Sequence, residues 1–319
     1  MKPIIPLLAA ALLAILAGAA QAQANQAAAA SPATPLSGVT VQAPPGPPAT
    51  FHDRFVESLN FVTSHGQPAH LGQLARWTEP VCPVTLGLSP EMNALVSERV
   101  KALDFRVGAP QARRPLRCKP NIEILFTDQP QKLMDLVAKK RNELLGFHYI
   151  PEERAVTRIV RPVQAWYLTE TLAGGGSNGS IDVQGTGGHA QSLDLADSHM
   201  PGGCAGSAFT ECLSSDFVNI LVVADANALG NRKIGQVADY IALITLAQFK
   251  MLETCDAFPT LLDTFTPACA NRAVAEAPAA QDIGYLKALY RGNSALKLWL
   301  QKSYAAEHMA GDAADAPKP

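Results

Sequence analysis

Histidine and aspartate side chains gather in one glycine-rich stretch, which covers residues 172–206. Imidazole and carboxylate groups this close in sequence can bind a divalent cation. The candidate ligands are His189, Asp194, Asp197 and His199. Their spacing matches none of the usual ligand patterns, and polar side chains of a loop are more often simply solvated. We therefore predict no metal site, and a metal-dependent hydrolase that uses this loop remains the alternative.

Two short glycine motifs in the same stretch match functional sequence patterns, but without the secondary structure that those motifs require. Residues 175–179 read Gly-Gly-Ser-Asn-Gly, but a nucleophile elbow needs a core strand before it and a helix after it. Residues 185–190 fit a dinucleotide-binding pattern, yet no helix pattern opens there. We predict no cofactor and assign no catalytic residue, so the sequence favours a protein that is not an enzyme.

Six cysteines form the second group of reactive side chains, and none of them belongs to a Cys-x-x-Cys motif. An even number of cysteines in an exported protein favours disulfides. Because sequential pairs would each close one local connection, we predict three bonds and leave open that one pair stays reduced and buried. The predicted pairs are Cys82–Cys118, Cys204–Cys212 and Cys255–Cys269.

The amino-terminal residues predict export. Lys2 precedes an uncharged apolar run over residues 4–20, and small residues around Ala22 and Ala24 form two candidate cleavage sites. This combination is typical of a secretory signal peptide over residues 1–24, with a retained anchor as the alternative. We expect a periplasmic or secreted protein, cleaved near Ala22 or Ala24, without a later membrane span.

The charge balance limits the classes of partner. The chain has 26 basic and 28 acidic residues, so its net charge of −2 offers no basic surface for nucleic acid. We predict no nucleic-acid partner. An envelope protein of unknown identity is the partner that export leaves open.

The elements that would position these residues begin after an Ala/Pro-rich segment, 25–50, which we predict to be a disordered linker. Apolar residues at helical spacing from Phe51 predict a first helix. Residues 77–88 resemble a strand, and Ser89-Pro90 should begin a helix. A strand is expected at 121–126 and a helix from Pro130.

The second half continues this alternation of strands and helices. Residues 154–168 predict one or two strands, 180–184 a short strand, and 217–224 the central strand of the sheet. A long helix at about 234–252, which is apolar on nearly every side, should be buried. Two helices, 282–290 and 294–304, and a disordered tail, 311–319, end the chain. We expect a single α/β (or α+β) domain over 51–310, with a mixed sheet layered with helices and a helical carboxyl terminus.

Two polar side chains, Asp225 and Asn227, follow the predicted central strand. Ligands often bind beyond the ends of strands in α/β proteins. Aspartate and asparagine also form turns through hydrogen bonds to their own backbone. We interpret this pair as turn-forming.

Several segments of the chain resemble a family of uncharacterised exported proteobacterial proteins. The segments that carry the resemblance are residues 80–83, 118–127, 163–167, 238–242 and 285–290. No activity is implied by it.

The order of elements also resembles, more distantly, a metzincin-like zinc-protease core, in which a sheet precedes a buried active-site helix. The matching helix here is 234–252, which contains no histidine and no glutamate. Zinc proteases of this kind need two histidines and a glutamate at fixed spacing on that helix. The resemblance therefore implies a degenerate protease-like fold without zinc chemistry. Because the predicted core is well formed but carries no coherent catalytic set, we expect a binding or envelope-maintenance role.

Overall fold

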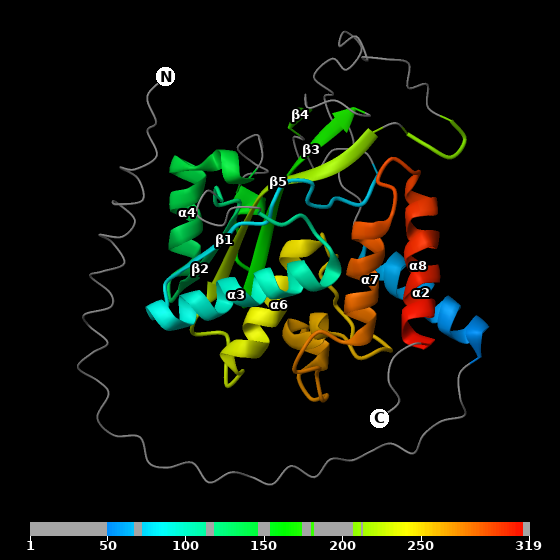
Figure 1. The fold of residues 1–319 in the computed structure, drawn as a ribbon. Helices are drawn as coiled ribbons and strands as arrows, with labels where there is room; N and C mark the ends of the chain where they lie inside the picture. Colours follow the sequence, from blue (N-terminus) through cyan, green and yellow to red (C-terminus); the bar gives the residue numbers. More distant parts are fainter. Residues whose placement is uncertain are drawn as a thin grey trace. The chain divides into compact units, whose positions relative to one another are not determined.

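The computed structural model describes residues 50–66, 72–112, 118–145, 154–173, 180–181, 207–211 and 213–314 (Figure 1). Its strands form one five-stranded sheet in the order β1-β2-β5-β3-β4. Strands β1, β2 and β5 are parallel, whereas β3 runs antiparallel to both β5 and β4. The strands are β1 (Pro83–Leu86), β2 (Ile122–Thr127), β3 (Val163–Ala173), β4 (Ser180–Ile181) and β5 (Leu213–Asp225).

Helices cover both faces of this sheet, so the predicted mixed α/β fold is confirmed. The helices are α2 (Phe51–His65), α3 (Pro90–Val107), α4 (Pro130–Lys140), α6 (Ile234–Leu246), α7 (Ala280–Arg291) and α8 (Leu298–Ala314). Short 3-10 turns are η2 (Asn142–Leu145), η3 (Leu261–Phe265) and η4 (Pro267–Cys269).

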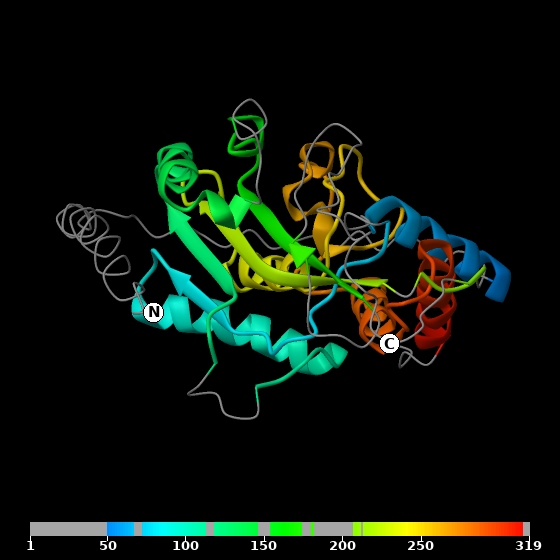
Figure 2. The same cartoon turned by 90° about the horizontal axis from the view of Figure 1, so that it is seen from above.

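Alternate residues of the sheet enter two separate cores. Ile122, Ile124 and Ile220 pack in the larger core, which also contains buried residues of α3 and α6. Leu125 and Leu221, one residue further along their strands, pack in the smaller core with residues of α4 and η2. This is the period-two pattern of a sheet covered on both faces. Figure 2 shows α3 and α4 on opposite sides of the sheet.

Strand β5 is the central strand, as its apolar sequence predicts, and it pairs with β2 on one side and β3 on the other. The predicted beginning of α3 is also confirmed. Ser89 caps this helix by accepting a hydrogen bond from the backbone N–H of Met92, and Pro90 occupies the first turn. Proline is tolerated there because the first N–H groups of a helix have no partner within it.

The strand predicted over 77–88 is wrong in extent, because β1 covers only Pro83–Leu86. Pro80 and Pro83 have no N–H group with which to continue a ladder. Upstream, Arg76 instead forms a parallel bridge with Asp216 of β5, which precedes the point where β2 begins to pair with β5. The chain therefore crosses from β5 to the edge of the sheet within this segment.

The strand prediction for 154–168 is wrong in its first part, since residues 154–156 are helical and β3 begins at Val163. The side chain of Gln131 bonds both the carbonyl of Thr157 (3.2 Å) and the N–H of Ile159 (3.0 Å). These backbone groups are thus satisfied without a neighbouring strand. Strand β3 also runs on to Ala173, into the stretch predicted as the glycine-rich loop.

The buried helix predicted at 234–252 is confirmed in place but is shorter, because α6 ends at Leu246. Three side chains bond its last carbonyl groups. The Trp77 indole N–H donates to Thr245 (2.8 Å), the Tyr167 hydroxyl to Ile244 (2.9 Å), and the Tyr290 hydroxyl to Leu246 (2.7 Å). The last carbonyls of any helix need such partners when they are buried.

The carboxyl-terminal helices differ from their predicted bounds as well. Helix α8 begins at Leu298 and extends through Ala314, into the segment 311–319 that the sequence predicted as a disordered tail. From Ala49 on, the chain forms one compact unit. Helices α2, α7 and α8 lie side by side at one end of it (Figure 1). Among the described helices, none is both long and apolar enough to cross a membrane.

Candidate functional site

The predicted metal candidates His189, Asp194, Asp197 and His199 lie outside the described residues, and so do Cys204 and Cys212. The other four cysteines are described and form two of the three predicted disulfides. Cys82 and Cys118 are joined with a Cα–Cα distance of 5.7 Å, and Cys255 and Cys269 with one of 5.4 Å. Sequential pairing is therefore confirmed for these two bonds.

The polar residues after the central strand form a closed turn. Asp225 accepts a hydrogen bond from the backbone N–H of Asn227 (3.0 Å), and the Asn227 amide donates to the carbonyl of Asp128 (3.2 Å). The backbone N–H of Ala226 bonds Thr127 at the end of β2 (2.9 Å). These bonds join the ends of two neighbouring strands, so the turn-forming interpretation is confirmed.

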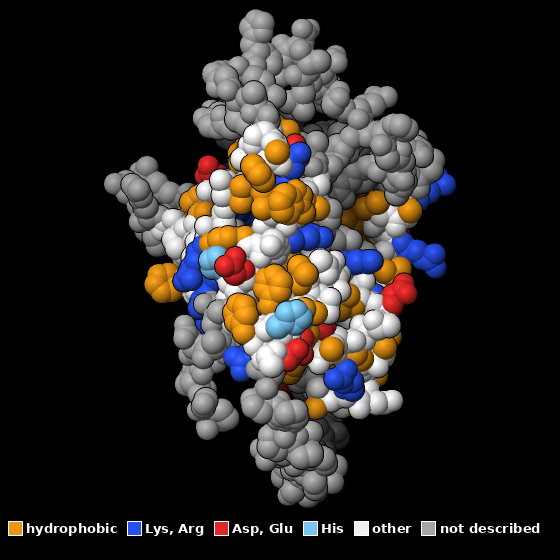
Figure 3. All heavy atoms as spheres, turned by 90° about the vertical axis from the view of Figure 1, so that its right-hand side faces the viewer, with side chains coloured by type: hydrophobic (Ala, Val, Ile, Leu, Met, Phe, Trp, Pro, Cys, Tyr) orange, Lys and Arg blue, Asp and Glu red, His pale blue; other side chains and the backbone are white. Residues whose placement is uncertain are grey.

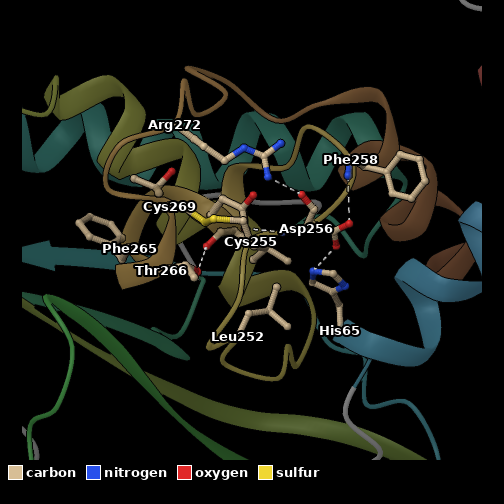
Figure 4. Close-up of a disulfide and its surroundings, with 12 residues drawn as sticks. His65, Leu252, Cys255, Asp256, Phe258, Phe265, Thr266, Cys269 and Arg272 are labelled. Carbon is tan, nitrogen blue, oxygen red and sulfur yellow. Dashed lines mark hydrogen bonds and ion pairs between the residues drawn. A yellow bond between two sulfur atoms is a disulfide. The ribbon is translucent and has the colours of Figure 1, made fainter. Parts of the chain in front are cut away.

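A group of ionisable side chains lies around the Cys255–Cys269 disulfide (Figure 4). We call residues 255–269 the disulfide loop. The Sγ atoms of both cysteines and a carboxylate oxygen of Asp263 lie within 4.8 Å of one another. Metal binding at cysteine requires the thiolate, and both sulfur atoms are used in the disulfide. In its oxidised form this group is therefore a crosslink beside an acid rather than a metal centre.

Three arginines fix the backbone of the disulfide loop and its flanks. Arg232 donates from Nε and Nη2 to the carbonyl of Thr264 (3.1 and 2.7 Å), and its guanidinium lies 4.7 Å from the centre of the Phe265 ring. Arg161 donates to the carbonyl of Leu252 (3.1 Å), and Arg272 to that of Asp256 (3.0 Å). Because these side chains come from different parts of the chain, the loop is held from several directions.

Buried acids complete the support of the loop. Asp282 of α7 accepts hydrogen bonds from the Thr260 hydroxyl (2.6 Å) and the Leu261 N–H (3.0 Å). Burial raises the pKa of Asp282 despite these hydrogen bonds, which favour its charged form. Burial likewise raises the pKa of Asp263, whose carboxylate accepts a bond from the Asp256 N–H (3.3 Å).

His65 joins α2 to the disulfide loop. Its side chain is fully buried, and its Nδ1 atom lies 2.9 Å from the carbonyl oxygen of Phe61. Its Nε2 atom lies 2.9 Å from a carboxylate oxygen of Asp256, an ion-pair distance at an angle that departs from an aligned hydrogen bond. Burial acts to raise the pKa of Asp256, but the contact with His65 and the bond from the Phe258 N–H outweigh it and leave that pKa lowered.

The chemistry open to this group is limited by its own hydrogen bonds. A general base needs a free lone pair aimed at a reactive group, whereas both nitrogens of His65 face acceptors. The hydroxyls of Thr260, Thr264 and Thr266 donate to Asp282, Leu261 and Leu262 respectively. The arrangement suits holding the loop in place, and none of the described contacts pairs a nucleophile with a base here.

Apart from its two cysteines, this group was not predicted from the sequence. His65 occupies the last turn of a helix, and its acidic neighbours lie far from it in sequence. The one local signal was the pair of cysteines, whose closed loop contains two acids, Asp256 and Asp263.

Helix α6, the counterpart of the protease active-site helix in the proposed resemblance, makes structural contacts with its polar residues. The Nη1 atom of Arg99 of α3 donates to both carboxylate oxygens of Asp239 (3.1 and 3.0 Å). Burial raises the pKa of Asp239, and the Arg99 guanidinium acts against that rise. Tyr240 packs edge-on against Phe265 at 4.8 Å between ring centres.

Two large aromatic side chains are exposed on backbone that is firmly paired. The carbonyl of Phe209 accepts a bond from the Lys297 N–H (3.0 Å), and the Glu211 N–H donates to Ala295 (2.9 Å). The Phe209 side chain is 59% exposed, and Trp299, two residues after this pairing, is 57% exposed. We call these two side chains the aromatic pair. Figure 3 shows the face to which α2 and α8 belong, where hydrophobic side chains lie among charged ones.

Comparison of this chain with protein-family models, with curated proteins and with solved structures found no match in any of the three.

Proposed function

We propose that this protein is exported and acts outside the cytoplasm by binding another envelope protein, on a degenerate protease-like fold. The observation that carries the binding role is the aromatic pair, Phe209 and Trp299, exposed on hydrogen-bonded backbone. Aromatic side chains contribute a large share of the energy of protein interfaces and lose little conformational entropy on binding. A rigid backbone beneath them lowers that entropic cost further.

The two disulfides support the proposed compartment. Such bonds persist in oxidising compartments and are rare in the cytosol of most organisms. Cell fractionation followed by amino-terminal sequencing tests export directly. The expected result is a mature chain outside the cytoplasm that begins just after Ala22 or Ala24; an unprocessed chain in the cytosol would contradict the proposal.

The binding role can be tested by site-specific photo-crosslinking in intact cells. A photo-reactive residue in place of Trp299 should give one discrete adduct with an envelope protein. The matched control is the same residue in place of Phe105, an aromatic that is 77% exposed on α3. The adduct from position 299 should be lost in a Phe209→Ala background that retains its circular dichroism spectrum. Equal labelling at both positions would refute the aromatic pair as the binding surface.

The alternative, a metal-dependent hydrolase that uses residues 172–206, predicts different results. Protein purified from the envelope would contain stoichiometric zinc or calcium, and a His189→Ala/His199→Ala double variant would lose it. Cleavage of casein or of a simple ester that stops on addition of a chelator would replace the binding proposal with this one. Elemental analysis of the purified protein is the first measurement to make.

A further inference from the structure

We propose that the contact between His65 and Asp256 is a proton-dependent latch, which fastens the carboxyl end of α2 to the disulfide loop. This latch belongs to the buried group around His65 and does not depend on the proposed binding role. The neighbours of the two ring nitrogens of His65 indicate which of these nitrogens carries a hydrogen.

The Nδ1 atom of His65 faces a backbone carbonyl, which can only accept, so this nitrogen must carry a hydrogen. The Nε2 atom faces a carboxylate oxygen of Asp256 at 2.9 Å. If Nε2 were unprotonated beside an ionised carboxylate, two lone pairs would face each other in a buried site. A proton on Nε2 removes this repulsion, so the contact is most favourable when His65 is an imidazolium paired with a carboxylate.

Three acids on the neighbouring elements favour this proton. Asp256 and Asp263 belong to the disulfide loop and Asp282 to α7, and the charge of His65 acts to lower the pKa of all three acids. Tyr285 of α7 is a buried phenol whose pKa is raised by burial, so it stays neutral. Among the cations, Arg272 donates to the carbonyl oxygen of Asp256, and Lys250 bonds the His65 carbonyl through its backbone N–H.

The latch acts where α2 meets the rest of the fold. The His65 carbonyl accepts a bond from the Lys250 N–H (2.8 Å), and Gly66 forms an isolated bridge with Phe249. The imidazole ring stacks on Phe61, with 4.2 Å between ring centres. A cation in the last turn of a helix also interacts favourably with the helix dipole. Loss of the proton would remove the ion pair and this dipole interaction together.

The latch should operate between two limits of pH. Asp256 has a lowered pKa in the folded state, so its contribution to stability is present above the pKa of an unfolded aspartate and is lost as the pH falls through the lowered value. Loss of the Nε2 proton at the other limit would leave His65 without its charge, and the ion pair with Asp256 would be lost with it. Alkaline solution should therefore loosen α2.

His308 provides a matched control within the same chain. Its Nδ1 atom lies 2.9 Å from the carbonyl oxygen of Tyr304, four residues earlier, and its ring lies 3.8 Å from the Tyr304 ring. Among the described contacts, however, His308 has no carboxylate partner. The two histidines thus share a helical carbonyl and an aromatic neighbour. They differ in the acid and in burial, since His65 is fully buried and His308 is half-buried.

The direct test is an imidazole nitrogen NMR titration of the full chain from about pH 5 to about pH 10, the range around the ordinary imidazole titration. His65 should keep the spectrum of an imidazolium at a pH where His308 already has that of a neutral ring. If both histidines lose their protons together, or if His65 is neutral near pH 6, the latch is refuted.

The variant Asp256→Asn distinguishes a proton-dependent ion pair from a contact that depends on packing alone. An asparagine amide can donate to a neutral Nε2 atom while its oxygen still accepts the bond from the Phe258 N–H, so the contact should survive without the extra proton. In the parent protein, hydrogen exchange of the α2 amides, corrected for intrinsic rates, should quicken about tenfold between neutral and alkaline pH, because loss of the ion pair makes local opening of α2 easier. In Asp256→Asn this change should be absent. The same acceleration in both proteins would overturn the proposal.

Discussion

Burial has a large effect on the pKa of the Asp104 side chain. Asp104 lies in the last turns of α3 and is 1% exposed. One of its carboxylate oxygens accepts a hydrogen bond from the Gln111 amide, and the other has no hydrogen-bond partner among the described contacts. Burial raises the pKa of Asp104 to about 7, against the opposing effect of Gln111. A buried acid with a missing partner disfavours its own charged form.

The sign of the resulting pH dependence follows from this raised pKa. The folded protein binds a proton at Asp104 that the unfolded chain has released, so this contribution to stability falls as the pH rises from about 4 to about 7. Asp104→Asn should therefore increase the free energy of unfolding by about 1–3 kcal/mol near pH 8 and change it little near pH 5. Urea denaturation at both pH values measures this, with Asp128→Asn on the exposed turn after β2 as the control. A loss of stability at pH 8 would contradict the argument.

At the scale of elements, the end of α6 is determined by side chains from distant segments. Trp77, Tyr167 and Tyr290 each donate to one of its last carbonyl groups, and Ala247 then continues in extended geometry. Helix α6 is buried on nearly every side, so water is a poor alternative partner for those carbonyls.

Removal of one such donor should be measurable. Tyr290→Phe leaves the Leu246 carbonyl without its 2.7 Å bond and should lower the free energy of unfolding by about 1–2 kcal/mol. Tyr304→Phe is the matched control, because the Tyr304 hydroxyl makes no hydrogen bond among the described contacts and its ring still packs on His308. Equal effects of the two substitutions in denaturant titrations would show that the hydroxyl bond does not stabilise the end of α6.

For the whole molecule, the two described disulfides constrain loops of different length. Cys82–Cys118 spans 36 residues and joins the chain before β1 to the chain before β2. Cys255–Cys269 spans 14 residues beside the end of α2. A crosslink lowers the entropy of the unfolded chain, and the effect grows slowly with the length of the loop that it closes.

Replacement of each pair with serine should therefore lower the stability of the whole domain. The chain-entropy relation predicts a loss of about 4 kcal/mol for Cys82→Ser/Cys118→Ser and about 3 kcal/mol for Cys255→Ser/Cys269→Ser. Thermal unfolding of the two double variants, beside the parent protein with and without a reducing agent, measures both losses. Unchanged stability of either variant under oxidising conditions would contradict the stabilising role of that bond.

Local signals in the sequence determined much of this fold. The apolar run of β5 predicted the central strand, Ser89-Pro90 predicted the beginning of α3, and the order of the cysteines predicted both described disulfides. Each of these features depends on residues close together in the chain, where hydrophobic period, capping and loop closure act.

The buried ionic group around His65 and the end of α6 were decided only by the tertiary structure. His65 and Asp256 lie in distant parts of the sequence and meet because α2 packs beside the disulfide loop. The donors at the end of α6 come from three separate segments. No local pattern encodes such contacts, because they form only when burial removes water and each polar group must find its partner within the protein.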